Sequence, residues 1–269
     1  MKRTLSTIVI SLSLVCGSAA TKSSDLPNKD IYYRTTSIDD YASTKCLLDI
    51  YTPESGKEFP TLIWFHGGGL SGGEKHIPER LKGNGFAIVA VGYRLSPQTL
   101  TPEIIDDAAA ATAWVFDNIG KYGGDTTKIF MAGHSAGGYL TLMLGYDKSY
   151  LGNYNIDSDR LAALIPYSPQ VITHFTNRKE RGMGEYQPLI DKYAPLYHIR
   201  PDAPPTLLIT GDREQELFGR YEENAYMWRM LNLIGHPDAK IMELDGFDHG
   251  DMTKPGDFLT IKYIKEKLR

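Results

Sequence analysis

The pentapeptide Gly133-His134-Ser135-Ala136-Gly137 constrains the fold of this chain more than any other segment. It fits the G-x-S-x-G pattern, follows an apolar run at Lys128–Ala132 and precedes a stretch with helical spacing at Gly137–Gly145. A strand that runs straight into a helix must turn sharply, and the flanking glycines allow the close backbone approach that this turn needs. The context predicts that Ser135 is held in a strained conformation, with its hydroxyl exposed as a candidate nucleophile.

Apolar runs of strand length alternate along the chain with stretches of helical spacing. Several runs, such as Ala-Ile-Val-Ala-Val, are apolar along their whole length, as in strands covered on both faces. The pattern predicts one α/β domain with a mostly parallel central sheet and helices on both faces, preceded by an antiparallel pair within residues 30–51. The predicted strands are Thr61–Phe65, Phe86–Gly92, Lys128–Ala132, Leu161–Tyr167, Thr206–Thr210 and Lys240–Leu244, and the predicted helices are Glu103–Ile119, Gly137–Gly145, Glu216–Leu233 and Asp257–Leu268.

The first twenty residues read as a targeting segment. Lys2 and Arg3 precede an apolar stretch from Leu5 to Val15, which is too short to span a membrane, and Ser18-Ala19-Ala20 offers small residues for cleavage. We interpret residues 1–20 as a signal peptide cleaved after Ala20, which predicts a secreted or periplasmic protein and leaves residues 21–269 as a single domain.

Two cysteines bear on this interpretation. Cys16 stands where a lipobox cysteine would stand, but Ser13-Leu14-Val15 fits that pattern poorly, so we favour cleavage over a lipid anchor. After cleavage Cys46 is alone, so the mature fold cannot depend on an internal disulfide, and we expect this thiol to be buried as a small hydrophobe.

The charge balance of the chain argues against nucleic acid as a partner. The chain of 269 residues has a formal net charge of −4, and removing Lys2 and Arg3 takes it from −4 to −6. A mildly acidic chain without a long basic run gives no reason to expect nucleic acid, and we predict no stable membrane insertion. The sequence leaves the oligomeric state open.

A glycine-rich segment, His66-Gly67-Gly68-Gly69, directly follows the predicted strand Thr61–Phe65. Bare backbone N–H groups in such a loop can face a developing negative oxygen, so Gly68 and Gly69, with Ala136 after the nucleophile, are the candidate oxyanion-hole donors. We expect His66 to fix the loop through hydrogen bonds rather than to act as a base. A phosphate-binding loop is disfavoured because no Gly-Lys-Ser/Thr follows.

The candidate base is His249, in Gly246-Phe247-Asp248-His249-Gly250 after the last predicted strand. A histidine in this loop can reach over the carboxyl edge of the sheet towards Ser135. A surface or structural role is the default for any histidine, and position is what sets His249 apart from His76, His174, His198 and His236.

Three carboxylates compete for the role of the acid that orients this histidine, in Gly211-Asp212-Arg213-Glu214-Gln215-Glu216. Such an acid usually follows the terminal small residue of the strand by about three positions, which selects Glu214. Asp212 is the alternative acid. Glu216 is expected to start the following helix, where a carboxylate favours the dipole.

Residues 168–205 interrupt the alternation with a polar segment rich in proline and aromatic residues. Long excursions of this kind are commonly lids or binding loops, and a surface insertion that packs its aromatic residues on the body is equally consistent with the composition. Elsewhere, Arg94 is expected to pair with Asp106 or Asp107, and Asp125 to cap the turn into the strand before Ser135.

Taken together, these segments resemble the α/β-hydrolase superfamily, specifically esterases of the hormone-sensitive-lipase and BD-FAE-like (carboxylesterase) branch. The resemblance covers residues 45–268. The chain departs from the family pattern at one place: the family usually has an aspartate as the acid, often followed by Pro-Leu, where this chain has Glu214-Gln215-Glu216-Leu217. The segments that carry it are His66-Gly67-Gly68-Gly69, Tyr93-Arg94-Leu95-Ser96-Pro97, Asp125-Thr126-Thr127-Lys128-Ile129, Gly133-His134-Ser135-Ala136-Gly137-Gly138 and Gly246-Phe247-Asp248-His249-Gly250.

The resemblance implies an α/β-hydrolase fold with a small lid-like insertion, a Ser135–Glu214–His249 triad that hydrolyses esters through an acyl-enzyme, and no metal or cofactor. The expected partners are small-molecule or carbohydrate esters with short acyl groups, such as acetyl or feruloyl groups on carbohydrates. The alternatives are an aryl formamidase-like amidase, a short-chain lipase, a peptidase, or a catalytically silent binding module. The retained serine, histidine, carboxylates and glycines disfavour the silent module.

Overall fold

A computed structural model describes residues 28–34, 39–54, 56–217 and 219–269, so the predicted signal peptide and Cys16 lie outside the described residues. The strands are β1 (Ile31–Tyr32), β2 (Leu47–Tyr51), β3 (Phe59–Phe65), β4 (Ala87–Val91), β5 (Gly124–His134), β6 (Ala163–Tyr167), β7 (Thr206–Gly211) and β8 (Ala239–Leu244). The α-helices are α1 (Asp40–Lys45), α2 (Thr101–Asn118), α3 (Ala136–Tyr146), α4 (Lys148–Gly152), α5 (Phe175–Glu180), α6 (Arg220–Leu233) and α7 (Thr253–Lys267). Short 3₁₀ turns occur at η2 (Glu79–Leu81), η3 (Ile119–Tyr122), η4 (Ser158–Arg160) and η5 (Pro195–His198).

The described strands form one sheet in the order β1-β2-β4-β3-β5-β6-β7-β8. The pairs β1–β2 and β2–β4 are antiparallel, and every later neighbouring pair is parallel. The sheet is therefore mostly parallel with an antiparallel lead-in, as predicted. Because the carboxyl ends of parallel strands meet at one edge, the loops after β3, β5, β6, β7 and β8 gather there.

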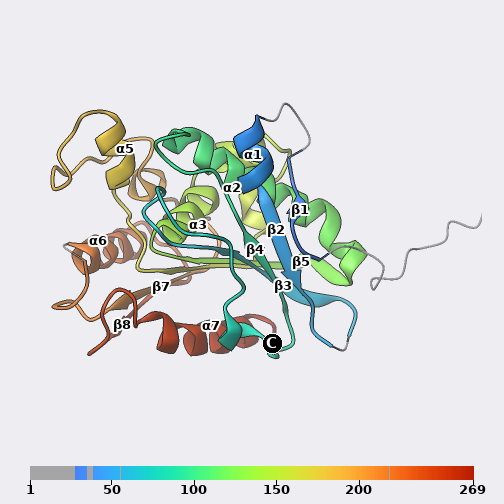
Figure 1. The fold of residues 1–269 in the computed structure, drawn as a ribbon. Helices are drawn as coiled ribbons and strands as arrows, with labels where there is room; N and C mark the ends of the chain where they lie inside the picture. Colours follow the sequence, from blue (N-terminus) through green and yellow to red (C-terminus); the bar gives the residue numbers. More distant parts are fainter. Residues whose placement is uncertain (1–27, 35–38, 55, 218) are drawn as a thin grey trace, which may run out of the picture.

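Alternate residues of each central strand point to opposite faces of the sheet, and both faces are covered. Ile63 and Phe65 of β3 belong to a core shared with α2, α3 and α6. Leu62 and Trp64 belong to a second core, shared with η2 and α7. Figure 1 shows these two layers, with α7 on one side of the sheet and α2 and α3 on the other. Two covered faces explain why the central strands are apolar along their whole length.

The predicted strands and helices are all confirmed, with one boundary error that matters for the site. The helix predicted from Glu216 begins at Arg220, after Gly219 in a left-handed conformation with φ of 70°. A residue at this φ breaks the helical run, so Glu216 belongs to the preceding turn. Its carboxylate is therefore not held at a helix N-terminus.

The structural roles expected of three other residues are confirmed. Arg94 donates two side-chain hydrogen bonds to Asp107, both of 2.8 Å, which joins the loop after β4 to α2. Asp125 accepts the Thr127 amide at 2.8 Å. Cys46 is a free cysteine with no exposed surface, and burial raises the pKa of its thiol to about 12.

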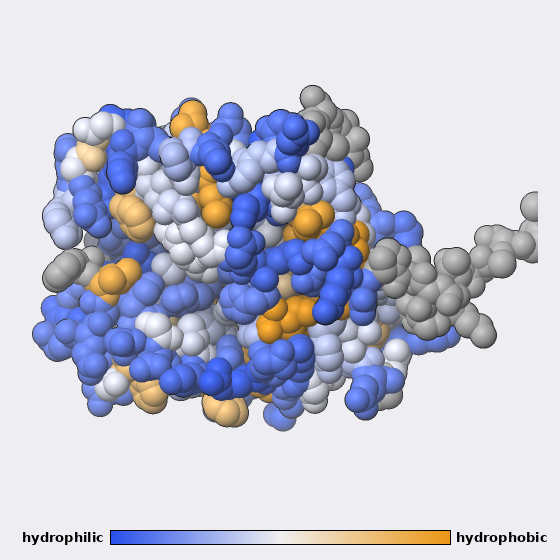
Figure 2. Space-filling view, in the orientation of Figure 1, coloured by the Kyte–Doolittle hydropathy of each residue, from blue (hydrophilic) through white to orange (hydrophobic). Residues whose placement is uncertain are grey.

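The exterior is largely hydrophilic on the face drawn in Figure 2, where apolar side chains form small separate patches. Among the residues that the structure describes, none of the helices has the length and apolar character needed to cross a membrane.

Candidate active site

The turn between β5 and α3 has the strained geometry that its sequence predicts. Ser135 has φ of 55° and ψ of −113°, outside the regions that a serine ordinarily occupies. Its amide donates to the Tyr167 carbonyl at 2.8 Å, so the pairing of β5 with β6 fixes the residue. Ser135 is therefore placed at the tip of the turn by the sheet itself, with 7% of its surface exposed.

The two flanking glycines are required by close packing. A Cβ on Gly137 would lie 2.1 Å from the Phe65 carbonyl oxygen, and one on Gly133 would lie 2.5 Å from the Gly137 carbonyl carbon. Both distances are far below a van der Waals contact, so no other residue fits without moving the backbone. The helix α3 can start directly beside β3 only because these positions have no side chain.

The glycine-rich loop after β3 passes beside the nucleophile. A Cβ on Gly67 would lie 3.5 Å from the Ser135 Cβ, which places the residue just before Gly68 and Gly69 beside Ser135. Ala136 begins α3, where the backbone N–H has no partner within the helix. The three predicted donor positions are thus brought to one end of the sheet.

His66, at the start of this loop, is held by contacts with Tyr93. Its ring is buried and stacks on Tyr93 with ring centroids 4.2 Å apart, and the Tyr93 hydroxyl donates to the His66 carbonyl at 2.6 Å. Burial lowers the pKa of His66 to about 4, so its imidazole is neutral at pH 7. These contacts agree with the expectation that His66 fixes the loop.

The loop after β8 brings His249 to the same edge. The His134 Nε2–H donates to the His249 carbonyl at 2.8 Å, and the two rings lie 4.7 Å apart. Asp248 accepts the amides of Gly250 and Asp251 at 2.8 and 2.7 Å and so shapes the turn that carries His249. The base predicted from sequence therefore lies beside the residue that precedes Ser135.

The carboxylate that pairs with His249 is Glu216. The His249 Nδ1 lies 2.5 Å from the Glu216 Oε1, and the Glu216 side chain has no exposed surface. Burial by itself would raise the pKa of Glu216, but the His249 hydrogen bond and charge, with the Leu217 amide and the Ser168 hydroxyl, lower that pKa to about 2. Glu216 is thus an ionised acceptor at neutral pH.

The sequence predicts Glu214 as the acid that pairs with His249, with Asp212 as the alternative, and the structure shows that neither prediction is right. Glu214 is exposed, and its amide donates to Asp212 Oδ1 at 2.8 Å. The other Asp212 oxygen accepts the Gly246 amide at 2.7 Å, and these two amide bonds lower the pKa of Asp212. The position of the acid could not be predicted from the number of residues after β7, because Asp212 starts a tight turn. This turn places Glu216 next to the loop that carries His249.

In the described residues, the His249 side chain makes its hydrogen bonds through Nδ1, and none joins its Nε2 to the Ser135 hydroxyl. Hydrogen bonds of catalytic groups are often absent or long before substrate binds. The Nε2 atom lies on the opposite side of the ring from Nδ1 and takes no part in these hydrogen bonds.

Two further residues take part in this arrangement, and the sequence did not predict a role for either. Ser168, directly after β6, has φ of 43°, and its Oγ lies 3.0 Å from the His249 Nδ1. His134 holds the His249 backbone as described, and burial, with the nearby His249 ring, lowers the pKa of His134 to about 4. The sequence signal that could have identified Ser168 is its position, directly after a predicted strand and at the edge of the sheet where the site lies.

Residues 168–205 contact the glycine-rich loop through α5. The Thr176 hydroxyl of α5 donates to the Gly69 carbonyl at 2.5 Å, and a Cβ on Gly69 would lie 2.8 Å from the Phe175 Cζ. The Glu180 carboxylate also accepts the Thr101 amide at the start of α2. The segment therefore forms a wall beside the site.

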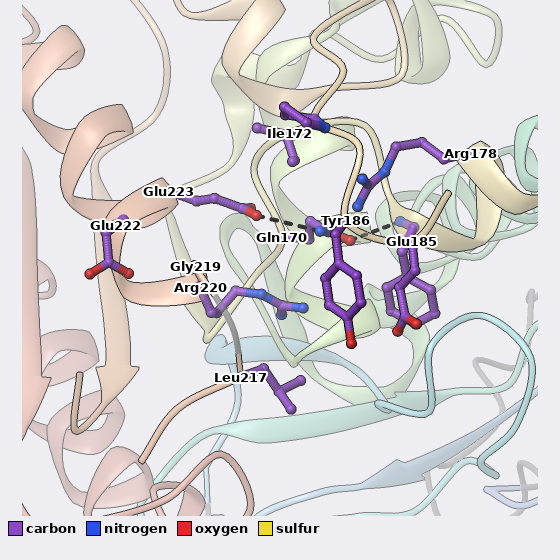
Figure 3. A pocket seen from close by; sticks show the side chains of 12 residues that line it. Gln170, Ile172, Arg178, Glu185, Tyr186, Leu217, Gly219, Arg220, Glu222 and Glu223 are labelled. Atoms are coloured by element: carbon purple, nitrogen blue, oxygen red, sulfur yellow. Dashed lines mark hydrogen bonds between the residues drawn. The ribbon is translucent and has the colours of Figure 1, made fainter. Parts of the chain in front are cut away.

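Two cavities flank these residues. One, of about 550 Å³, is lined by residues of the insertion and of the segment that leads into α6, including Phe175, Leu217 and Arg220 (Figure 3). The other, of about 520 Å³, is lined by Gly67 and His134 together with residues near η2 and α7. The second cavity reaches Gly67 and His134, which adjoin Ser135.

Several curated relatives that match the sequence are named as esterases. The chain is 27% identical to the esterase LipC of Mycobacterium tuberculosis over 76% of its own length and 56% of LipC. It is 35% identical to the carboxylesterase NlhH of the same species over 44% of the chain and 39% of NlhH. The matched region thus spans about half the length of these relatives.

Solved structures share the fold. A truncated form of a carbohydrate esterase from gut microbiota has a TM-score of 0.75 at 19% identity, covering 89% of this chain and 95% of that one. Esterase 2 of Thermogutta terrifontis with propionate bound has a TM-score of 0.66 at 21% identity, covering 81% and 88%. At these identities the likeness establishes the α/β-hydrolase fold.

The BD-FAE family model matches residues 48–219, which is well over half of the chain and includes the glycine-rich loop, Ser135 and Glu216. The chain belongs to the BD-FAE family and has the α/β-hydrolase fold.

Proposed function

We propose that this protein is a serine carboxylic-ester hydrolase whose nucleophile, base and acid are Ser135, His249 and Glu216. The observation that carries the proposal is the buried Glu216–His249 pair, at the edge of the sheet where the strained turn presents Ser135. An ionised acceptor on Nδ1 fixes the tautomer of the imidazole, so that Nε2 is free to take a proton. The esterase relatives support the same chemistry.

The first half of the reaction acylates the serine. The Ser135 Oγ attacks the ester carbonyl carbon while its proton moves to the His249 Nε2. The amides of Gly68, Gly69 and Ala136 then hold the negative oxygen of the tetrahedral intermediate. When the intermediate collapses, His249 returns the proton to the departing alkoxide, and an alcohol leaves.

The second half releases the acid. A water molecule gives its proton to the His249 Nε2 and attacks the acyl carbon, and the new intermediate collapses with return of that proton to the Ser135 Oγ. Glu216 stays ionised throughout and stabilises the imidazolium that forms twice.

For the substrate we propose short-acyl esters, with acetyl or feruloyl groups on carbohydrates as the leading class. Cavities beside the site offer room for a small ester, and one structural neighbour is described as a carbohydrate esterase. We also propose that residues 1–20 direct the protein out of the cytoplasm. The protein would then meet such esters outside the cell or in the periplasm.

The test is hydrolysis of p-nitrophenyl esters from acetate to octanoate, comparing wild type with Ser135→Ala. Turnover that depends on Ser135 and falls with acyl length supports the proposal. Absence of serine-dependent turnover on every ester contradicts it, and a fluorescent serine-directed phosphonate then separates the alternatives. Labelling of Ser135 would point to amide or formamide substrates, and no labelling of the folded protein to a binding module.

A further inference from the structure

The cavity of about 550 Å³ lies between the insertion on one side and the start of α6 on the other. Its apolar walls include Ile172, Phe175, Pro188 and Leu217. Figure 3 shows Arg178 of α5 and Arg220 of α6 extending into this space from different sides. The cavity thus combines apolar walls with two cations.

Both arginines are buried, each with 3% of its surface exposed. The Arg178 Nη1 donates to the Gln187 carbonyl, while its Nε is buried without a hydrogen-bond partner. The Arg220 Nη1 donates to the Ser168 carbonyl at 2.5 Å. Within the described residues, neither guanidinium has a carboxylate oxygen within ion-pair distance, and both bond to backbone carbonyls instead.

A buried guanidinium without a counter-ion is costly, because its charge has left water without a compensating negative group. Burial lowers the pKa of both Arg178 and Arg220, which reflects this cost, although an arginine stays charged at neutral pH. An anion that entered the cavity would stabilise such a pair.

The acidic residues on the cavity wall do not supply that anion. Glu223 accepts the Val171 amide at 3.1 Å, and burial raises its pKa. Glu222 pairs with Arg213 at 2.6 Å. Glu185 is exposed, so its charge is solvated. The Glu223 charge acts on both cations, that of Glu185 on Arg178 and that of Glu216 on Arg220, but among the described residues none of these carboxylates bonds to either guanidinium.

The cavity borders residues of the proposed site at three places. Leu217 follows Glu216 in the chain, Phe175 packs on Gly69, and Arg220 holds the Ser168 carbonyl. The cavity is therefore adjacent to the groups that hold His249 and the glycine-rich loop in place.

We infer that Arg178 and Arg220 bind a carboxylate of the ester substrate, so that the preferred substrates are anionic esters. This inference rests on the proposed function. Planar guanidinium groups match carboxylate oxygens through paired N–H donors, and the apolar walls would contact the carbon skeleton beside the charge. The carboxylate belongs either to the acyl group, as in a dicarboxylic acid monoester, or to the alcohol, as in an acetylated uronic acid.

Two matched substrate pairs test the inference and separate these sources. For the acyl side, p-nitrophenyl hydrogen adipate is compared with p-nitrophenyl hexanoate. For the alcohol side, an O-acetylated methyl galacturonoside is compared with its carboxamide. We expect wild type to prefer the anionic member of one pair by roughly tenfold or more in kcat/KM, because charge-assisted hydrogen bonds are lost with the neutral one.

Arg178→Gln should reduce this anionic-to-neutral ratio about tenfold, and Arg178→Lys, which keeps the charge without the paired donors, by less. Arg181→Gln is the matched control, because Arg181 lies three residues away and pairs with Asp191 outside the cavity. Its ratio should equal that of wild type. Should Arg178→Gln fail to fold, the intermediate ratio of Arg178→Lys decides the test.

A binding measurement separates this inference from the proposed function. Calorimetric titration of wild type with adipate and with methyl galacturonoside should show binding of one anion, absent with the corresponding neutral amide and weakened in the Arg178 variants. Arg178-dependent binding without any ester turnover would reject the proposed function and retain the anion site. No preference for either anion, in turnover and in binding, would overturn the inference, as would a preference unchanged in Arg178→Gln and Arg178→Lys.

Discussion

The Nδ1 atom of His249 lies 2.5 Å from Oε1 of Glu216, and the Glu216 side chain has no exposed surface. The carboxylate also accepts the amides of Gly211 at 3.1 Å and Leu217 at 2.9 Å, so both of its oxygens are held. The pair is therefore fixed in one geometry by the backbone of the turn after β7.

Replacing Glu216 should cost far more activity than replacing Glu214. Glu216→Gln removes the charge that stabilises the imidazolium, so we expect kcat to fall by about 10²–10⁴-fold. Glu214→Gln alters an exposed side chain and should stay within about twofold. The measurement is kcat/KM on p-nitrophenyl acetate for both variants, and the opposite ranking would restore Glu214 as the acid.

Removal of the Ser168 hydroxyl should lower kcat without weakening substrate binding. Ser168 Oγ lies 3.0 Å from the His249 Nδ1, so its loss loosens the imidazole but leaves both cavities unchanged. We expect Ser168→Ala to reduce kcat by roughly tenfold, with KM within about twofold. A variant with unchanged kcat and a lowered melting temperature would assign Ser168 a structural role only.

Stability should depend on pH through Asp257. This carboxyl in α7 is 2% exposed, accepts the Tyr167 hydroxyl at 3.2 Å, and lies 3.7 Å from the Arg80 Nη1. Burial raises its pKa from 3.8 to about 6. Because the folded pKa lies above the unfolded one, the contribution is fully present below about pH 4 and is lost as pH rises through 6.

A shift of this size corresponds to roughly 3 kcal/mol. Asp257→Asn keeps an acceptor for Tyr167 and removes the charge, so the variant should gain about 1–3 kcal/mol over wild type at pH 8 and almost nothing at pH 4. Urea unfolding at both pH values measures the difference. The exposed Asp251→Asn serves as control, and an equal effect of Asp257→Asn at both pH values would refute the prediction.

The close packing at the turn predicts a contrast between two glycines. Gly137→Ala would place a Cβ 2.1 Å from the Phe65 carbonyl oxygen, whereas a Cβ on Gly152 would meet nothing within 4 Å. We expect Gly137→Ala to destabilise the fold by about 3 kcal/mol or more, and Gly152→Ala, in α4, to stay within about 1 kcal/mol. Melting temperatures of the two variants check this, and similar values would contradict it.

Periodicity and the glycine pattern predicted most of the fold because both are local signals. Continuous apolar strands predicted a sheet covered on both faces, and the G-x-S-x-G segment between a strand and a helix predicted the strained turn. The loop glycines and His249 were found because their positions follow from the ends of predicted strands. Ser135, Gly68, Gly69, Ala136 and His249 are accordingly brought to one edge.

The partner of His249 was decided by tertiary structure alone. Three carboxylates follow β7 within five residues, and sequence cannot show which of them points inward. Asp212 is occupied by the amides of Glu214 and Gly246, and the left-handed Gly219 delays α6 to Arg220, so the turn buries Glu216. Burial beside a hydrogen-bond donor, rather than spacing along the chain, selects the acid.

The sequence by itself thus determined the sheet, the nucleophile and the loop that carries the base, since each depends on a few neighbouring residues. Only the tertiary structure decided the choice of Glu216, the place of Ser168, and the meeting of Arg178 with Arg220 in one cavity. These residues come from segments far apart in the chain. Their juxtaposition depends on packing across the sheet edge, which no local pattern records.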